Sequence, residues 1–307
     1  MEKVLITGGS GFIGLATKTK LCNLDYKILS IGRAINEDII IDLKDNKKLK
    51  KILDDFQPNI VLHFASGSNI TRANENKDKE FGDTITATSN LINCLKEVNL
   101  NPKFIYLSSQ AVYGIPESLP ISELHPTKPI TIYGTCKLRT EELIVNSKFD
   151  YLIFRIPSIF GKNQNFNKSG VIAKFIEKMQ AGQSPIIFND PDIISDFIYI
   201  EDVADVIVKG LTDKIYPSIK NKIFNLGSGK PTSLKQVLDI LYLYFPGTPI
   251  PELKENNLYL SKAQKGLYLD INKIKKALEW EPLYTIETGL KDMIENTKSF
   301  KNAQAIY

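Results

Sequence analysis

Two residues that could exchange protons lie four positions apart near the middle of the chain. Tyr133 and Lys137 bracket the segment Tyr-Gly-Thr-Cys-Lys in a stretch whose apolar spacing is typical of a helix. Residues four apart lie on one helical face, one turn apart. A neighbouring ammonium group lowers the pKa of a tyrosine because it favours the phenolate. The pair predicts an acid/base site, although a solvated surface pair has the same spacing.

A glycine-rich turn near the N-terminus is the second chemical signal. An apolar strand at 4–6 precedes Gly8, Gly11 and Gly14, and a helix follows over 15–21. This variant of the G-x-G-x-x-G pattern lets the backbone approach a diphosphate, while the helix N-terminus offers free N–H groups to it. An ordinary glycine turn is the alternative. The residues expected to contact a dinucleotide here are Thr7, Gly8, Gly11, Phe12, Ile13 and Gly14.

Alternating strands and helices must position these residues. Further strands are expected at 27–31, 39–43, 59–64, 103–107 and 151–156, with helices at 81–98 and 133–145 among the segments between them. This alternation predicts an α/β fold of the Rossmann type, a doubly wound parallel sheet covered by helices on both faces. Ligands of such sheets bind beyond the carboxyl ends of the strands, and such ends are followed by the glycine loop, Gly32-Arg33, Asp42, residues 63–66 and Ser108-Ser109.

The second half of the chain has a different character. Beyond position 161 short strands, turns and helices alternate, and an amphipathic helix is expected at 285–298. We expect a cofactor-binding domain at 1–160, to which 195–222 returns, and a smaller, interwoven α/β substrate-binding domain at 161–307. The sequence shows no repeat and no flexible linker.

Composition excludes several classes of function. The chain has 307 residues, 43% of them hydrophobic and 24% charged, with a net charge of +4. No basic run indicates nucleic acid, and no apolar run approaches the ~18 residues of a membrane span. Strand residues begin at position 4, and three isolated cysteines lack metal spacing, so we expect a cytoplasmic protein without a metal site. Of the two histidines, His63 and His125, the first is expected to be structural.

The ordered set of motifs resembles the extended branch of the short-chain dehydrogenase/reductase superfamily, which contains nucleotide-sugar epimerases, dehydratases and reductases. The resemblance covers nearly the whole chain. It is carried by residues 7–14, 41–43, 63–65, 107–114, 133–137, 155–161, 196–204, 224–229 and 278–282.

The resemblance implies a role for each matching residue. Tyr133 would be the acid/base on a sugar hydroxyl, Lys137 would lower its pKa and bind the cofactor ribose, and Ser109 would polarise the reacting oxygen. Further cofactor contacts are implied for Gly32, Arg33, Asp42, Leu43, Phe64, Ala65, Ser66, Ile156 and Pro157. Asp42 and Ser66 could instead be ordinary polar residues at strand ends. Substrate contacts are expected at Ser109, Gln110, Ser158, Lys162 and Lys262.

Departures from the family pattern narrow the reaction. Gly32 stands where an NAD-type acid ends the second strand, and Arg33 follows. An arginine there attracts a 2′-phosphate, which favours NADP(H) over NAD(H), unless it stacks on the adenine. Gln110 and Ala111 replace the Asp-Glu pair of family dehydratases, so a dehydratase is not expected. No arginine follows Arg155, which leaves lysines for a substrate diphosphate, although each lysine could be a solvated surface charge.

We therefore expect an NAD(P)-dependent nucleotide-sugar 4-epimerase or 4-ketoreductase. Two alternatives stay open: an NADPH-dependent reductase of a non-nucleotide carbonyl compound, and a non-catalytic cofactor-binding protein on the same fold. Relatives pair the helices at 81–98 and 133–145 into a four-helix bundle, so a homodimer is also expected.

Overall fold

The computed structural model describes residues 1–67, 70–164, 170–188, 190–255 and 266–304. Its centre is a seven-stranded sheet in the order β11-β6-β5-β4-β1-β2-β3, with every neighbouring pair parallel. The strands are β1 (Glu2–Thr7), β2 (Tyr26–Gly32), β3 (Ile39–Ile40), β4 (Ile60–His63), β5 (Lys103–Ser109), β6 (Tyr151–Ile156) and β11 (Lys222–Asn225). Because β1 pairs with both β2 and β4, the strand order reverses beside it, and such a switch point is where ligands of these sheets bind.

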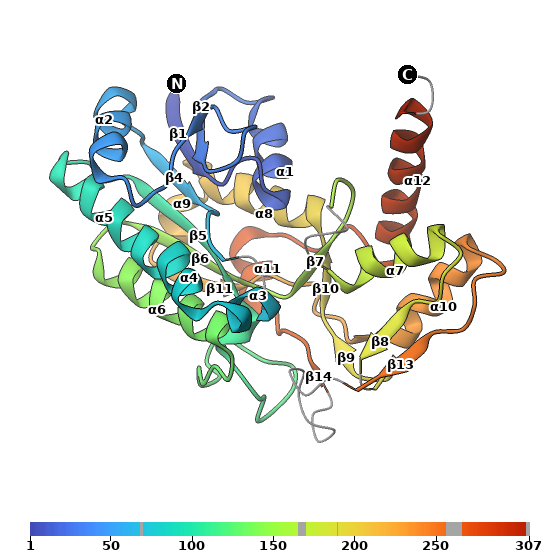
Figure 1. Ribbon diagram of the computed structural model, residues 1–307. Coiled ribbons are helices and arrows are strands. Elements are labelled where there is room, and N and C mark those ends of the chain that lie inside the picture. Colours follow the sequence, from blue (N-terminus) through green and yellow to red (C-terminus); the bar gives the residue numbers. More distant parts are fainter. Residues whose placement is uncertain (68–69, 165–169, 189, 256–265, 305–307) are drawn as a thin grey trace.

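Helices cover both faces of the sheet (Figure 1). One face carries α1 (Phe12–Leu21), α8 (Ile200–Leu211), α9 (Tyr216–Ile219) and α11 (Asn272–Leu278); the other carries α2 (Asn46–Phe56), α5 (Ala87–Glu97) and α6 (Ile132–Asn146). Side chains of β1 alternate between the two layers, as the pleat of a strand requires. Val4 and Ile6 join the first core, while Leu5 joins the second. The expected doubly wound α/β fold is confirmed.

Two expected elements differ most from the observed ones. Pairing of β3 covers two residues rather than 39–43, because the Asp42 carboxylate turns the chain by accepting from Lys44 N and Asp45 then caps α2. The helix expected at 81–98 is three pieces: the end of α4 (Lys77–Phe81), a π-helical turn at 82–86, and α5. A further short helix, α3 (Ile70–Glu75), precedes α4. The turn begins at Gly82, a residue type that weakens helix interiors.

The remaining elements form a smaller unit. Strand β7 (Ser158–Phe160) pairs with β10 (Phe197–Tyr199), β9 (Ile194–Ser195) with β12 (Thr232–Ser233) and β14 (Gly266–Leu267), and β8 (Ile186–Phe188) with β13 (Glu252–Lys254). Helices α7 (Val171–Gln180), α10 (Leu234–Tyr244) and α12 (Ile286–Gln304) share a core with them, to which Phe175, Leu238 and Leu290 contribute. Helix α12 extends from this unit toward the C-terminus (Figure 1).

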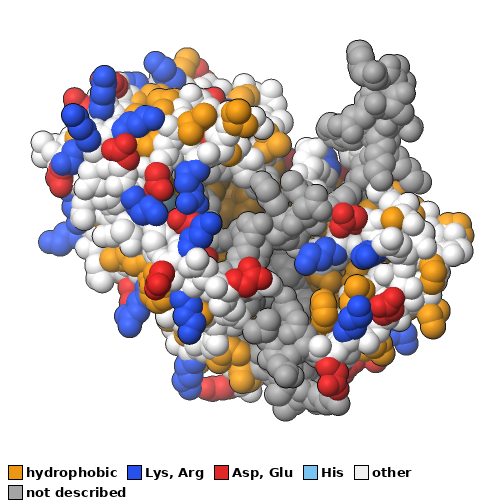
Figure 2. Space-filling model, viewed as in Figure 1, with side chains coloured by type: hydrophobic (Ala, Val, Ile, Leu, Met, Phe, Trp, Pro, Cys, Tyr) orange, Lys and Arg blue, Asp and Glu red, His pale blue; other side chains and the backbone are white. Residues whose placement is uncertain are grey.

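The chain passes between the two parts more than once. After β10 it returns to the sheet through α8, α9 and β11, and after β14 it returns again to place α11 beside β11. This path agrees with the expectation of two interwoven domains. The boundary between them, at residues 160 and 161, stays a prediction. On the face in Figure 2, basic and acidic side chains are interspersed over the part that carries α2 and α5. Among the described helices, none is both long and apolar enough to cross a bilayer.

Candidate active site

The glycine loop between β1 and α1 can hold a diphosphate. Gly8 adopts a φ of +72°, which L-residues with side chains rarely adopt, and a Cβ on Gly14 would lie 2.3 Å from the Gly8 carbonyl oxygen. Helix α1 starts after Gly11, whose position provides no side-chain cap. The amides of the first helical turn therefore lack partners within the helix and are available to an anion. The loop thus offers a close backbone approach and free donors to an anion, and binding of a dinucleotide diphosphate here stays a prediction.

Ser109 ends β5 at the carboxyl edge of the sheet. Its Oγ accepts a hydrogen bond of 3.2 Å from Ala111 N at the start of a 3-10 turn (Gln110–Val112), so its own proton can be donated to another oxygen. In the pairing of β5 with β6, Ile156 lies directly opposite Ser109. The structure thus brings the expected nicotinamide contacts, Ile156 and the buried Pro157, beside the expected polarising hydroxyl.

Tyr133 and Lys137 lie on the first turns of α6. The helix is capped by Thr131, whose side chain accepts from Gly134 N. Lys137 is 5% exposed, and its Nζ lies 5.7 Å from the centre of the Tyr133 ring. The same Nζ donates to Leu107 O and to Ser66 Oγ, both at 2.9 Å. One side chain thereby joins α6 to the ends of β4 and β5.

Burial dominates the acid/base behaviour of this pair. Loss of hydration raises the pKa of Tyr133 to about 12, and a hydrogen bond with Ser109 opposes this only in part. Lys137 was expected to lower that pKa, but it does not contribute to the shift, and its ammonium donates to Ser66 and the Leu107 carbonyl instead. Burial also lowers the pKa of Lys137 to about 8, against the attraction of Glu80 and Glu141.

The end of β4 lies next to the glycine loop. Ala65 N donates to Thr7 Oγ1 at 3.2 Å, and Phe64, Ala65 and Ser66 are all partly buried there. His63 is fully buried between Thr7 and Thr88, with ring nitrogens 2.7 and 2.8 Å from their hydroxyls. Burial lowers the pKa of His63 to about 3, so the ring is neutral and holds β4 against the loop. This arrangement agrees with the expected structural role.

Arg33 follows β2 and is largely exposed. Its guanidinium makes a two-pronged ion pair with Asp83 in the π-helical turn, with both N–O distances 2.8 Å. Asp42 and the buried Leu43 lie at the turn into α2, where adenine contacts are expected. The charge of Arg33, expected to meet a 2′-phosphate, is already neutralised by a carboxylate.

The residues expected to contact the substrate are less closely grouped than those expected to contact the cofactor. Ser158 is exposed at the start of β7, and the side-chain oxygen of Gln110 is buried without a hydrogen-bond partner among the described residues. Lys162 pairs with Glu201 at 3.0 Å, so its ammonium is engaged. Lys262 lies outside the described residues.

Sequence reasoning missed two buried carboxylates. Glu37 is 7% exposed and accepts two hydrogen bonds from Ser10 of the glycine loop. Glu80 is 5% exposed, accepts from Thr84 Oγ1, and has its pKa raised by burial. Both stand in polar stretches typical of a surface, so only the tertiary structure could reveal their burial.

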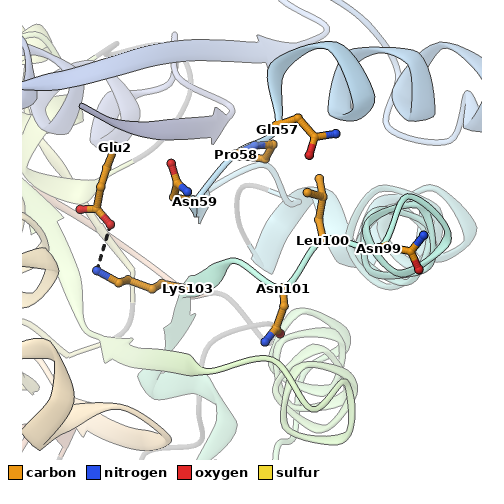
Figure 3. Close-up of a pocket in the computed structure, with 8 residues that line it drawn as sticks. All are labelled: Glu2, Gln57, Pro58, Asn59, Asn99, Leu100, Asn101 and Lys103. Atoms are coloured by element: carbon orange, nitrogen blue, oxygen red, sulfur yellow. Dashed lines mark hydrogen bonds and ion pairs between the residues drawn. The ribbon is translucent and has the colours of Figure 1, made fainter.

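A separate hollow lies at the opposite edge of the sheet (Figure 3). Glu2 and Lys103, which begin β1 and β5, form an ion pair of 3.1 Å in its wall. Asn59, just before β4, accepts from Lys3 N. Since ligands of parallel sheets bind at the carboxyl edge, we assign no role to this hollow. No group of three or more potential metal ligands occurs in the part of the chain that the structure describes.

Comparisons with known proteins agree with this geometry. Residues 4–227 match the model of the NAD dependent epimerase/dehydratase family. The chain is 32% identical to a Methanocaldococcus jannaschii protein named "Putative UDP-glucose 4-epimerase", over 96% of this chain and 98% of the relative. It is 28% identical to the UDP-glucose 4-epimerase of Mycoplasma genitalium, over 97% and 96%. The solved UDP-glucose 4-epimerase of Thermotoga maritima, crystallised with UDP-glucose, shares the fold with a TM-score of 0.88 at 24% identity, covering 97% of this chain and 99% of that one.

Proposed function

Because the chain belongs to the NAD-dependent epimerase/dehydratase family, we propose that it is a nucleotide-sugar 4-epimerase whose substrates are UDP-hexoses. One observation carries the proposal: Ser109, Tyr133 and Lys137 converge at the carboxyl edge of the sheet, beside a glycine loop that fits a dinucleotide. The names of the relatives, UDP-glucose 4-epimerases, support the choice of a UDP-sugar.

The proposed reaction moves one proton through Tyr133. Its phenolic oxygen takes the proton of the sugar 4-hydroxyl and later returns it, while the Ser109 hydroxyl donates a hydrogen bond to the same sugar oxygen. The bound dinucleotide supplies the redox chemistry, as acceptor and then donor of the hydrogen at C4. Inversion requires that the intermediate keto sugar turn between the two transfers.

Lys137 prepares the site for this proton transfer. With a pKa of about 8 it stays protonated at neutral pH, and its position over the Tyr133 ring allows it to stabilise a phenolate as it forms. Burial raises the pKa of Tyr133 to about 12, so the phenol alone is a poor base at neutral pH and needs this positive charge nearby to lose its proton.

We further propose that the protein is a cytoplasmic homodimer that pairs through α5 and α6. The two helices lie side by side on one face of the sheet, and Val145 of α6 is 42% exposed. Phe81, which precedes the turn into α5, has the same exposed fraction. Light scattering coupled to size-exclusion chromatography tests this, and a Val145→Glu variant should shift the protein to a monomer.

The central test measures conversion of UDP-glucose to its 4-epimer. Tyr133→Phe removes only the hydroxyl and is expected to lower kcat by at least ~10³-fold, with dinucleotide binding retained. Tyr242→Phe is the matched control, since the Tyr242 hydroxyl contacts Pro249 O outside the site. Full turnover in Tyr133→Phe contradicts the mechanism. Absence of epimerisation together with net consumption of reduced cofactor when a 4-keto sugar nucleotide is supplied would indicate a 4-ketoreductase instead.

A further inference from the structure

Glu37, which lies outside β2, places its carboxylate beside the end of that strand, where β2 has no acidic residue of its own. β2 ends at Gly32, and Ile31 is paired with Thr7 at the start of the glycine loop. In dinucleotide-binding folds an acid in this region accepts hydrogen bonds from the adenosine ribose. Gly32 has no side chain to do so, but the chain turns back and buries Glu37 beside it: a Cβ on Gly32 would lie 3.1 Å from Glu37 Oε1.

Contacts with the glycine loop hold this carboxylate in place. Glu37 Oε1 accepts from Ser10 N at 2.9 Å and from Ser10 Oγ at 2.7 Å. A Cβ on Gly9 would lie 3.2 Å from the other oxygen, Oε2. The carboxylate therefore lies between the end of β2 and the loop expected to hold the diphosphate.

Glu37 Oε2 lacks a hydrogen-bond donor among the described residues. The side chain is 7% exposed, and Oε2 is buried without a hydrogen-bond partner among the described residues. A buried carboxylate oxygen without a donor is costly. A ligand hydroxyl at this place would remove that cost, whereas a ligand phosphate would add a second negative charge.

The nearby cations are engaged elsewhere. Arg33 is paired with Asp83, and Lys18 is paired with Asp38 at 2.9 Å. Glu37 makes no ion pair with any residue in the described ranges. The charge facing the end of β2 is therefore negative, which is the reverse of the setting that a 2′-phosphate needs.

We propose that Glu37 binds the adenosine ribose hydroxyls of the cofactor and makes the protein select NAD over NADP. This inference rests on the proposed dinucleotide site and assigns its specificity to a residue five positions beyond the end of β2. It replaces the 2′-phosphate contact that the sequence suggested for Arg33. Gly32 has a complementary role, because a side chain at that position would crowd Glu37.

The test is calorimetric titration of cofactor-free protein with NAD and NADP, and with ADP-ribose and its 2′-phosphate. The second pair isolates the adenosine end of the cofactor. The wild type is expected to bind NAD and ADP-ribose on the order of 10- to 100-fold tighter than their 2′-phosphorylated forms. Glu37→Gln should weaken the binding of NAD about tenfold. It should also bring the affinities for NAD and NADP closer together. Thermal unfolding of the ligand-free variant, at or above the wild-type Tm, verifies that it folds.

A control variant separates Glu37 from its neighbour Arg33. Arg33→Ala removes the competing cation and should keep the ratio of NAD affinity to NADP affinity of the wild type. An unchanged ratio in Glu37→Gln, or equal wild-type affinity for NAD and NADP, overturns the inference and leaves the proposed function standing. Loss of NADP binding in Arg33→Ala also overturns it. Failure of the wild type to bind either dinucleotide overturns both proposals.

Discussion

Gly134, the residue after the proposed acid/base Tyr133, packs against the backbone carbonyl of Ala111. A Cβ on Gly134 would lie 2.5 Å from that oxygen, closer than real side chains come. Ala111 N in turn donates to Ser109 Oγ. The contact therefore sets the distance between the helix that carries Tyr133 and the turn that orients Ser109.

Gly134→Ala should impair catalysis through this contact. The clash is with backbone, which cannot rotate away, so α6 must shift relative to Ser109. We expect kcat to fall by about 10²-fold, as for a displacement of about 1 Å, and stability to fall by about 1–3 kcal/mol. Gly82→Ala is the control, because a Cβ there meets only Lys44 Nζ at 3.7 Å. Steady-state kinetics and thermal unfolding measure both effects; wild-type kcat in Gly134→Ala would refute the positioning role.

The neutral, buried His63 should make the fold sensitive to acid. Its pKa is lowered from 6.5 to about 3, so between these values the unfolded chain binds a proton that the folded chain does not. The stabilising contribution is complete above pH 6.5 and is lost as the pH falls toward 3. It amounts to roughly 3–5 kcal/mol on an order-of-magnitude scale.

Replacement by glutamine tests this linkage. His63→Gln should lower stability at pH 7 but show a shallower loss between pH 6.5 and 4 in urea unfolding. His125→Gln is the control, since that ring accepts from Glu117 N in an exposed loop. Equal acid sensitivity of wild type and His63→Gln would show that other groups are responsible.

A buried ion pair ties α6 to β6 behind the site. Arg155 Nη2 lies 2.6 Å from Glu141 Oε2, the two side chains are 6% and 2% exposed, and Ser108 Oγ donates to the same carboxylate. Glu141→Gln leaves the guanidinium buried without its counter-charge, so we expect a loss of about 3–5 kcal/mol in the free energy of unfolding.

The same helix offers a matched control. Arg139 and Glu142 pair at 2.8 Å with side chains 64% and 47% exposed. Glu142→Gln should cost no more than about 0.5 kcal/mol, because water screens an exposed pair. Urea unfolding of both variants measures the difference; similar losses would contradict the argument from burial.

The local patterns of the chain determined the fold class and the residues of the proposed site. Apolar runs alternating with helical periodicity specify a parallel sheet, and three glycines at spacing three specify a tight turn into a helix, because both follow from backbone geometry. Tyr133 and Lys137 share a helical face by the same logic. These features depend on neighbours within a few residues, which a sequence displays directly.

Tertiary structure decided what depends on distant partners. The sequence suggested that Arg33 could bind a phosphate, but its guanidinium forms an ion pair with Asp83, 50 residues away. Lys137 was expected to lower the pKa of Tyr133, but loss of hydration raises that pKa, and the Lys137 ammonium donates to Ser66 and Leu107. Glu37 stands in a polar stretch, and only folding against Ser10 buries it. Burial and pairing are set by packing between segments, and they decide which charges remain available for chemistry.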